Sequence, residues 1–517
     1  MSELIGNMPE SNLQDHKSGT GLHAQHRRQT AIRGIVATIL VALLALAFAG
    51  GSIIQLSQTP SSFVPSFSVS PTASDSSTWY CAIPDLSSLP GVSVALTLVN
   101  VSKFRQHATI TVASALGKRT STLVSLNPGS TDAVAGKFAN AGKVGVTVDF
   151  SGGGDFAAYS ISGQNTQAQG FCQPSPGPTW TVQALSTLGS SDGVISIYNP
   201  FSTDSIIDIN LISPGGVQAP APLQAVVVGA YQSISVDLSD WVQNQPTIGM
   251  SIQTRLGRVV PGGIEMRSDT KANGVSAAVI SPEIFSSYTF PLLGQSINQS
   301  VSIDLYNYSP NQANVEITLQ ELKGSVASTL IDKGKANDLV SSFAETVPGN
   351  SSLSIPLKSI ASVPVGAFFS MVVRDTGFVL PVVTLVGSAV GPSGGYFTES
   401  GQGASWPSWL SVLFANPGAT ELNKLAVVYV SSRPGAPALL GRDFLNGTKA
   451  QLGPDSIDAQ AGLAISGSRT AVDVFPTVDP GGFPSTFVLR SSSYAMVGIA
   501  FVQADGSLVP VDTIATD

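Results

Sequence analysis

One recurring pattern limits what this chain can fold into: a run of alternating apolar and small polar residues that ends at an asparagine. The run occurs four times, and its asparagines lie 99, 108 and 109 positions apart. They are Asn100, Asn199, Asn307 and Asn416. A fixed period of this length indicates repeated structural units. Alternation with period two predicts strands whose successive side chains face opposite sides of a sheet.

Each repeat continues in a similar way after its asparagine, with a second alternating run, a turn followed by a strand pair, and a closing pair of runs. The second runs are 108–112, 206–211, 313–319 and 425–430, and the strand pairs lie at 127–131, 228–232, 347–351 and 453–456. Roughly seven short strands in about 100 residues is typical of an immunoglobulin-like sandwich. We therefore predict an all-β protein of tandem immunoglobulin-like β-sandwich units at 78–178, 179–286, 287–404 and 405–517. A propeller is the alternative, but its blades repeat every 40–50 residues or so.

Two residue types mark equivalent places in the repeats. The asparagine side chain is expected to bond the backbone of the turn that follows it, which is a structural role. Aromatic residues open the repeats at Trp79, Trp180, Tyr288 and the pair Trp406/Trp409. Core or edge packing explains these aromatics, and a platform for stacking sugars is the alternative.

The first 77 residues have a different composition. No charged residue occurs from 34 to 74, and residues 34–56 are long enough to cross a bilayer as a helix, which takes about 20 residues. Basic residues flank only the N-terminal side of this segment, which predicts a cytoplasmic N-terminus. We predict a basic tail at 1–33, a transmembrane signal-anchor helix at 34–56 in the lipid bilayer, and a Ser/Pro-rich linker at 57–77. A cleaved signal peptide ending at Ala47-Phe48-Ala49 is the alternative.

The composition bounds the classes of partner. Charged residues make up 11% of the chain, against about 25% in an average soluble domain, and the net charge is −8. Nucleic acid is excluded as a partner because phosphate binding needs clustered cations. A hydrophobic content of 43% argues against a disordered chain.

The two cysteines, Cys81 and Cys172, lie near the first and last strands of the first predicted unit. An exported pair with no third cysteine favours a disulfide, with free thiols as the alternative. The loop of about 90 residues that it would close corresponds to a stabilisation on the order of 4 kcal/mol.

Motifs for catalysis are weak. His107 is the one histidine of the predicted exported part, so a Ser-His-Asp mechanism would depend on it. Gly391-Pro-Ser393-Gly-Gly395 resembles a nucleophile elbow, but no histidine follows it, and a linker is the better interpretation. Ser268-Asp-Thr-Lys271 lacks its companion motifs, while Asp192-Gly193 and Asp505-Gly506 are interpreted as hairpin turns. We predict no catalytic, cofactor-binding or metal-binding residue. Distant paired carboxylates leave no local motif, so glycoside hydrolysis stays open.

The motifs Trp79-Tyr-Cys81, Asn127-Pro-Gly-Ser-Thr131, Asn199-Pro-Phe-Ser202 and Asn416-Pro-Gly418 occur behind one predicted membrane helix and a Ser/Pro spacer. This arrangement resembles an uncharacterised actinobacterial family of single-pass envelope proteins, catalogued as a domain of unknown function. The resemblance covers roughly residues 78 to 517 and implies location and architecture, but no site residue. Asn100-Val-Ser departs from the Asn-Pro pattern.

The sequence therefore favours a non-enzymatic, membrane-anchored scaffold or binding protein of the bacterial cell envelope. Its expected partner is an envelope protein or cell-wall glycan, and its C-terminal region is expected to be extracytoplasmic. The alternative is an extracytoplasmic glycan-processing hydrolase or a carbohydrate-binding accessory protein.

Overall fold

The computed structural model describes residues 77–516, with gaps. The gaps are 135–143, 154, 164–165, 269–272, 283, 297–298, 322–339, 361–367, 390–395, 401, 403–405, 414–423, 432–438, 445–468, 476–484, 503–507 and 512–513. The chain divides into two compact units, Met1–Phe63 and Val64–Asp517, and every described residue belongs to the second. The predicted tail at 1–33, helix at 34–56 and nearly all of the linker lie outside the described residues. Among the described residues, no helix is long and apolar enough to cross a membrane.

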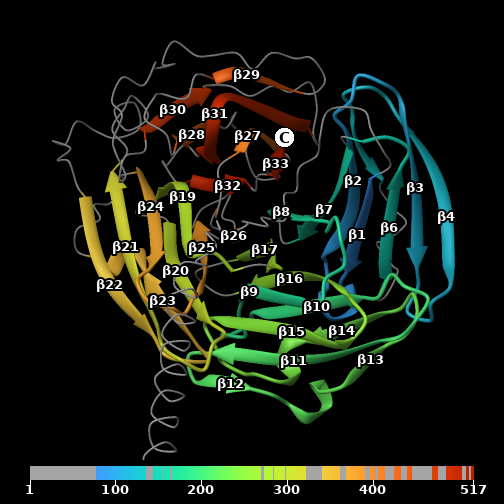
Figure 1. The fold of residues 1–517 in the computed structure, drawn as a ribbon, viewed down its shortest axis with the longest axis horizontal. Coiled ribbons are helices and arrows are strands. Elements are labelled where there is room, and N and C mark those ends of the chain that lie inside the picture. Colours follow the sequence, from blue (N-terminus) through green and yellow to red (C-terminus); the bar gives the residue numbers. More distant parts are fainter. Residues whose placement is uncertain are drawn as a thin grey trace, which may run out of the picture. The chain divides into compact units, whose positions relative to one another are not determined.

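The first repeat consists of eight strands in two four-stranded antiparallel sheets (Figure 1). The strands are β1 (Thr78–Ile83), β2 (Ser93–Asn100), β3 (Gln106–Ala113), β4 (Arg119–Leu126), β5 (Thr131–Val134), β6 (Val144–Phe150), β7 (Asp155–Gly163) and β8 (Thr166–Phe171). One sheet has the order β1-β6-β3-β4 and the other β5-β2-β7-β8. Both sheets contribute to one hydrophobic core, because alternate residues of each strand point inward.

The second and third repeats follow the strand order of the first repeat. The second comprises β9 (Thr179–Leu185), β10 (Asp192–Tyr198), β11 (Ser205–Ser213), β12 (Gly216–Gln218), β13 (Val226–Val228), β14 (Ser233–Asp237), β15 (Ile248–Leu256), β16 (Val260–Ser268), β17 (Asn273–Ala277) and β18 (Val279–Ser281). The third comprises β19 (Ser287–Gly294), β20 (Gln299–Asn307), β21 (Ala313–Glu321), β22 (Val340–Val347), β23 (Ser351–Pro356), β24 (Phe368–Asp375), β25 (Val382–Ala389) and β26 (Tyr396–Ser400). The third repeat has sheets β19-β24-β21-β22 and β23-β20-β25-β26, which reproduce the first. The second differs by splitting its fourth strand into β12 and β13 and by adding β18 at an edge.

The fourth repeat, as far as the structure describes it, is one seven-stranded sheet. Its strands are β27 (Trp406–Leu413), β28 (Lys424–Ser431), β29 (Leu439–Phe444), β30 (Arg469–Phe475), β31 (Ser485–Val502), β32 (Leu508–Val511) and β33 (Ile514–Thr516). The long strand β31 pairs with β27 through its first half and with β28 through its second. The described part of this repeat therefore differs from the two-sheet pattern of the other three.

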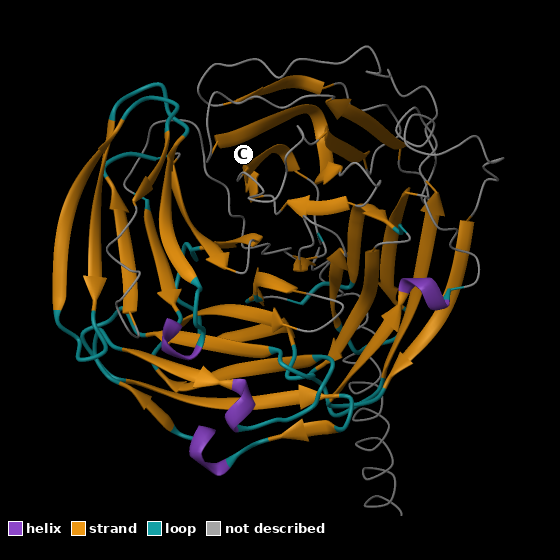
Figure 2. Ribbon diagram, turned by 180° about the vertical axis from the view of Figure 1, so that it is seen from behind, coloured by secondary structure: helices purple, strands orange, loops and turns teal. Residues whose placement is uncertain are grey.

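The all-β prediction is confirmed: in the part of the chain that the structure describes, Figure 2 shows strands joined by loops, and the helical segments are short turns of three residues. The immunoglobulin-like strand order is not confirmed. In an immunoglobulin domain the first strand lies beside the second. Here β1 pairs with β6, and β2 pairs with β5 and β7. Alternation fixes which side chains face the core, but it carries no information on which strand lies next to which.

The aromatic residues that open the first three repeats lie in their cores, as predicted. Trp79, Trp180 and Tyr288 are each at most 5% exposed. The indole N–H of Trp79 donates to the Asp155 carbonyl at 2.9 Å, and that of Trp180 donates to the Val259 carbonyl at the same distance. A buried indole needs such an acceptor, so these tryptophans are structural.

The repeated asparagines tie loops together, also as predicted. The side-chain amide of Asn199 donates to the carbonyls of Thr203, Val228 and Gly229 at 2.7, 3.0 and 3.1 Å, and its oxygen accepts from the Phe201 N–H. Asn100 and Asn307 make the same set of bonds in their own repeats. All three are fully buried. Each asparagine thus joins the loop after the second strand to the turn before the fifth. Asn416 lies outside the described residues.

Candidate functional site at the tyrosine junctions

The sheet that contains the second strand of a repeat is buried on both faces in the second and third repeats. In β10, Ile195 and Ile197 enter the core of the second repeat, whereas Val194 belongs to the core cluster of the first. In β20, Ile303, Leu305 and Tyr306 belong to the core cluster of the third repeat, and the Tyr306 hydroxyl also bonds to the second repeat. The outer face of each of these sheets therefore packs on the preceding repeat, and we name the two contacts the first junction and the second junction.

A tyrosine packed on a glycine lies at the centre of each junction. Tyr198 and Tyr306 immediately precede the buried asparagines, and both are at most 1% exposed. A Cβ added to Gly145 on β6 would overlap the Tyr198 ring. A Cβ added to Gly249 on β15 would lie 2.7 Å from Tyr306 Cδ1. Gly145 and Gly249 are both the second residue of their strands, and β15 has the sheet position in the second repeat that β6 has in the first, so the two junctions use one device.

The Tyr306 hydroxyl is the centre of a hydrogen-bond network at the second junction. It accepts from the Ala184 N–H at 3.0 Å and from Thr247 Oγ1 at 2.8 Å, and it donates to Asp304 Oδ2 at 3.4 Å. Ser354 Oγ donates to the other oxygen of Asp304 at 2.6 Å. This network crosses from the second repeat to the third and uses all the hydrogen-bonding capacity of the phenol. Burial raises the pKa of Tyr306 far above its ordinary value, so the hydroxyl stays protonated.

The backbone of Ala184 is strained at the point where it meets this hydroxyl. Its φ angle is +62°, in the left-handed region that residues with a Cβ seldom adopt. The pairing of β15 with β9 shifts register between Ile248 and Met250, opposite this residue. Such an irregularity redirects a backbone N–H, and here the N–H of Ala184 points to Tyr306.

Carboxyl groups are buried close to the second junction. Burial raises the pKa of Asp304, and its hydrogen bond from Ser354 opposes the rise. Burial also raises the pKa of Glu265 to about 8, although the Arg267 guanidinium lies 3.5 Å from its carboxylate and the Ser186 N–H donates to it at 3.1 Å. Desolvation therefore outweighs the attraction of the cation at Glu265.

Among the described residues, the carboxyl groups that most resemble a catalytic acid pair are Asp192 on β10 and Asp237 on β14. Burial raises the pKa of Asp192 to about 7, and the neighbouring carboxylate of Asp237 adds to the rise. Asp237 also accepts from Ser239 Oγ at 2.6 Å, as the cap of a short helical turn. A carboxyl group with a raised pKa beside a second carboxylate is one feature of glycoside hydrolases.

Most of these groups are closed to a substrate. Glu265 and Tyr306 are fully buried and Asp304 is 3% exposed, so none presents an atom to solvent chemistry. Among the described residues, no group of three or more His, Cys, Asp or Glu side chains is placed to hold a metal ion. These buried groups hold one repeat on the next through hydrogen bonds.

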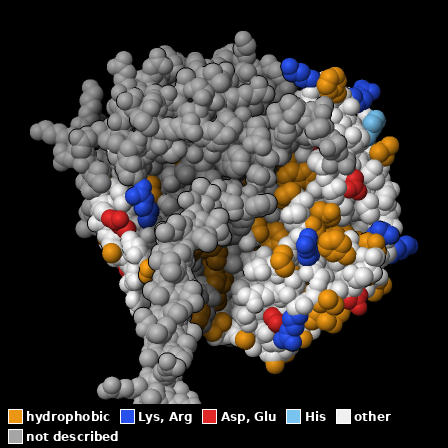
Figure 3. All heavy atoms as spheres, in the orientation of Figure 1, with side chains coloured by type: hydrophobic (Ala, Val, Ile, Leu, Met, Phe, Trp, Pro, Cys, Tyr) orange, Lys and Arg blue, Asp and Glu red, His pale blue; other side chains and the backbone are white. Residues whose placement is uncertain are grey.

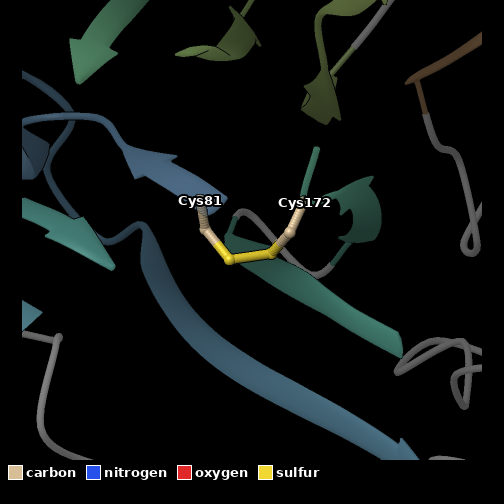
Figure 4. The surroundings of a disulfide bond; sticks show 2 residues. All are labelled: Cys81 and Cys172. Carbon is tan, nitrogen blue, oxygen red and sulfur yellow. A yellow bond between two sulfur atoms is a disulfide. The ribbon is translucent and has the colours of Figure 1, made fainter. Parts of the chain in front are cut away.

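The predicted disulfide is confirmed. Cys81 on β1 is bonded to Cys172, which directly follows β8, and their Cα atoms are 4.5 Å apart (Figure 4). Next to it, Tyr80 and Gln173 exchange backbone hydrogen bonds of 2.8 Å in each direction. The bond therefore joins the first and last strands of the first repeat, which belong to different sheets.

Other residues singled out in the sequence are found as follows. The sequence suggested a polar connection over Lys103–His107, but His107 lies exposed on β3, because the strand begins at Gln106. The interpretation of Asp192-Gly193 as a hairpin turn is wrong: the turn is at Gly189–Ser190, and Asp192 already pairs with Met266. Ser268 ends β16. The segments 269–271, 391–395 and 505–506 lie outside the described residues.

The junction tyrosines were not recognised from the sequence. Their signal is that Tyr198 and Tyr306 precede the asparagines of the second and third repeats, where the first has Val99 and the fourth has Ala415. In the second and third repeats a tyrosine thus replaces a smaller aliphatic residue. A large aromatic residue with a polar hydroxyl at this position indicates that the outer face of the sheet is buried as well.

No known protein-family profile matches the chain. No curated protein matches its sequence. Among solved structures, a tetra-tandem repeat from the extending region of a large adhesion protein is similar at 9% identity, over 80% of this chain and 92% of that one, with a TM-score of 0.10. So low a TM-score supports no statement on fold or function, and the resemblance to the actinobacterial envelope family stays a prediction.

Proposed function

We propose that this protein is a non-enzymatic scaffold or binding protein of the bacterial cell envelope, held in the membrane by residues 34–56 with its repeats outside the cytoplasm. The observation that carries the proposal is the pair of tyrosine junctions, which join successive two-sheet repeats through buried contacts. Their strand order differs from that of immunoglobulin domains, but the two-sheet sandwich is of the same kind. A series of repeats fixed to one another in this way is suited to presenting binding surfaces at a constant spacing.

The surface supports a binding role outside the cell. The chain has few charges, and on the described face in Figure 3 few Lys, Arg, Asp or Glu side chains are scattered among hydrophobic and other side chains. The disulfide supports an oxidising compartment. A surface of this composition depends little on salt.

The experiment uses the full chain, purified in detergent in its oxidised form. We expect it to retain either a solubilised envelope protein or cell-wall glycan from the source organism. Protease added outside intact cells is expected to digest the repeats but not the N-terminal tail. The proposal is overturned if neither class of molecule is retained. It is also overturned if the repeats survive protease added to intact cells but are digested once the cells are lysed.

A glycan-processing hydrolase is the second candidate, and the Asp192–Asp237 pair is the observation that favours it. The test is release of reducing ends from cell-wall glycan. Activity that Asp192→Asn abolishes, with the free energy of unfolding unchanged, would replace the binding proposal with this one.

A further inference from the structure

We propose that the β3–β4 hairpin, residues 101–130, is a docking edge for an extended segment of a partner protein that has an uncharged centre and acidic ends. The inference names the partner class for the binding role proposed above, and it rests on that role. Three observations carry it: an open edge strand, exposed apolar side chains along it, and cations at both of its ends.

β4 is the edge strand of its sheet and lies beside β3 alone among the described strands. Thr120, Ser121, Leu123 and Ser125 are exposed on it, and Leu123 is 67% exposed. An uncharged edge strand without proline is the kind of edge that accepts another strand. From Thr120 to Leu126 the strand has no charged residue and no proline.

The equivalent edges of the next two repeats are protected. In the second repeat the edge is split into β12 and β13, with Pro220 and Pro222 between them. In the third repeat the edge strand β22 carries Glu345. Prolines and charges are the usual means by which proteins block strand pairing at an edge. In the first repeat, β4 has neither from Thr120 to Leu126, so of these three edges it is the one suited to pairing.

The charge of the hairpin is opposite to that of the chain. Residues 101–130 contain Lys103, Arg105, Lys118 and Arg119 and no Asp or Glu, whereas the whole chain has a net charge of −8. All four cations are exposed, and none forms an ion pair with another described residue. In Figure 3, basic side chains lie near both ends of this hairpin.

Each pair of cations adjoins an exposed apolar side chain. Phe104, 65% exposed, lies between Lys103 and Arg105, and Leu116, 88% exposed, lies shortly before Lys118. The Arg119 guanidinium lies 3.8 Å from the centre of the Tyr231 ring, which holds it in place at the end of β4. At the other end, Arg105 donates to Asn127 Oδ1 at 3.1 Å.

These features define the partner segment. A strand paired along β4 would span about eight residues, on the order of 26 Å at about 3.3 Å per residue. Its centre would lie beside Ser121, Leu123 and Ser125, which favours uncharged, β-branched residues. Its ends would lie beside the cations, which favours Asp or Glu. A second copy of β4 fits less well, because antiparallel self-pairing brings Arg119 towards Arg105 of the other copy, and like charges repel.

The test titrates full-length protein in detergent into a fluorescently labelled peptide of sequence Glu-Glu-Thr-Ile-Thr-Val-Thr-Glu-Glu. A second peptide has Lys at the four acidic positions, and a third has Pro at its centre. We expect both altered peptides to bind at least about tenfold more weakly, and hydrogen exchange to show added protection of residues 119–126 with the first peptide alone. Raising the salt from about 0.05 to 0.5 M should weaken binding of the first peptide.

Leu123→Lys is the diagnostic variant, since an edge lysine blocks strand pairing at an exposed position. We expect it to weaken binding about tenfold. Leu256→Lys is the matched control, because Leu256 is 57% exposed on another sheet, and it should leave binding unchanged. The docking edge is wrong if all three peptides bind equally well, or if the first peptide protects residues other than 119–126 from hydrogen exchange. It is also wrong if the protein self-associates and Leu123→Lys abolishes that self-association.

The same variant separates this inference from the proposed function. If wild-type protein and Leu123→Lys retain the same envelope partner equally well, the binding role stands and the docking edge is wrong. If wild-type protein retains no envelope component, the binding role itself fails. Loss of a retained protein in Leu123→Lys but not in Leu256→Lys supports both.

Discussion

The first and second junctions place the same side chain on the same backbone position, yet their surroundings differ. At the first junction the Tyr198 hydroxyl has one partner, Thr147 Oγ1 at 3.2 Å, and apolar residues of the second repeat, Val194, Ile264 and Val275, join the core cluster of the first. At the second junction the Tyr306 hydroxyl has three partners, and the core cluster of the third repeat contains residues of that repeat alone. One junction is held mainly by apolar burial and the other mainly by buried hydrogen bonds.

The same tyrosine-on-glycine contact can therefore be stabilised by different interactions in different repeats. Apolar burial is non-directional and tolerates small changes in geometry. A buried polar network depends on every member, because an unpaired group in the interior costs about 1–3 kcal/mol. We therefore expect the second junction to be the more sensitive to single-atom changes and to pH.

The largest expected change in the free energy of unfolding comes from the disulfide of the first repeat. This change should leave the second junction unaffected. Replacing both Cys81 and Cys172 with serine removes a cross-link between residues 91 positions apart, which contributes on the order of 4 kcal/mol. Urea unfolding followed by hydrogen exchange should show the loss in β1 to β8. Equal loss of protection in the third repeat would show that the repeats unfold together, which contradicts separate stabilisation of the junctions.

Removing the two phenolic oxygens compares the junctions directly. Tyr306→Phe leaves Ala184 N–H and Thr247 Oγ1 without their acceptor and removes the donor to Asp304 Oδ2, so we expect a loss of about 2–3 kcal/mol in the free energy of unfolding. Tyr198→Phe removes one bond and should cost about 1 kcal/mol or less. Equal losses, measured by urea denaturation, would contradict the assignment of the polar network to the second junction.

Adding one methyl group tests the packing of ring on glycine. Gly145→Ala and Gly249→Ala each place a Cβ against a tyrosine ring, and we expect each to cost about 1–3 kcal/mol through overpacking. Gly189→Ala, where a Cβ would meet no atom within 4 Å, controls for added bulk, although its positive φ adds backbone strain of its own. Junction variants less destabilising than this control would show that the tyrosines do not depend on a bare backbone beneath them.

The smallest expected effect, taken per step, is the change in the free energy of unfolding over one pH unit. The pKa of Glu265 is raised to about 8 and that of Asp304 is raised as well, so the folded protein binds protons more tightly than the unfolded chain. Their contribution to stability is therefore complete below the unfolded pKa, near 4, and is lost as the pH rises towards 8, by at most about 1.4 kcal/mol per pH unit for each group.

Urea midpoints between pH 5 and pH 8 measure this dependence. We expect the midpoint to fall as the pH rises, and we expect Glu265→Gln to flatten the curve because glutamine does not titrate. A midpoint that rises with pH in wild-type protein would show that these carboxyl groups are stabilised as anions.

Much of the fold follows from the sequence, because alternation and a fixed period are local signals. The runs ending at Asn100, Asn199 and Asn307 are strands or directly adjoin them, and their side chains bond the loops as expected. The disulfide followed from the count and placement of two cysteines. The pairing of β1 with β6 did not follow, since neighbour relations between strands arise from long-range packing.

The candidate site was largely hidden from sequence reasoning. Tyr306, Asp304, Ala184 and Thr247 are up to 122 positions apart, and nothing in a local window indicates that they meet. Asp304 alternates with the buried Ile303 and Leu305 like any outward-facing strand residue, so the pattern predicts exposure. Only the packing of a second repeat over that face buries it.

The most direct test of the account is hydrogen exchange of the full chain with Tyr306→Ala. If the tyrosine holds the third repeat on the second, protection should fall at Ala184, at residues 245–249 and along β20, while β1 to β8 and the first junction keep theirs. Exchange that is unchanged around Tyr306, or that rises equally in all the repeats, would contradict a junction fixed by this side chain.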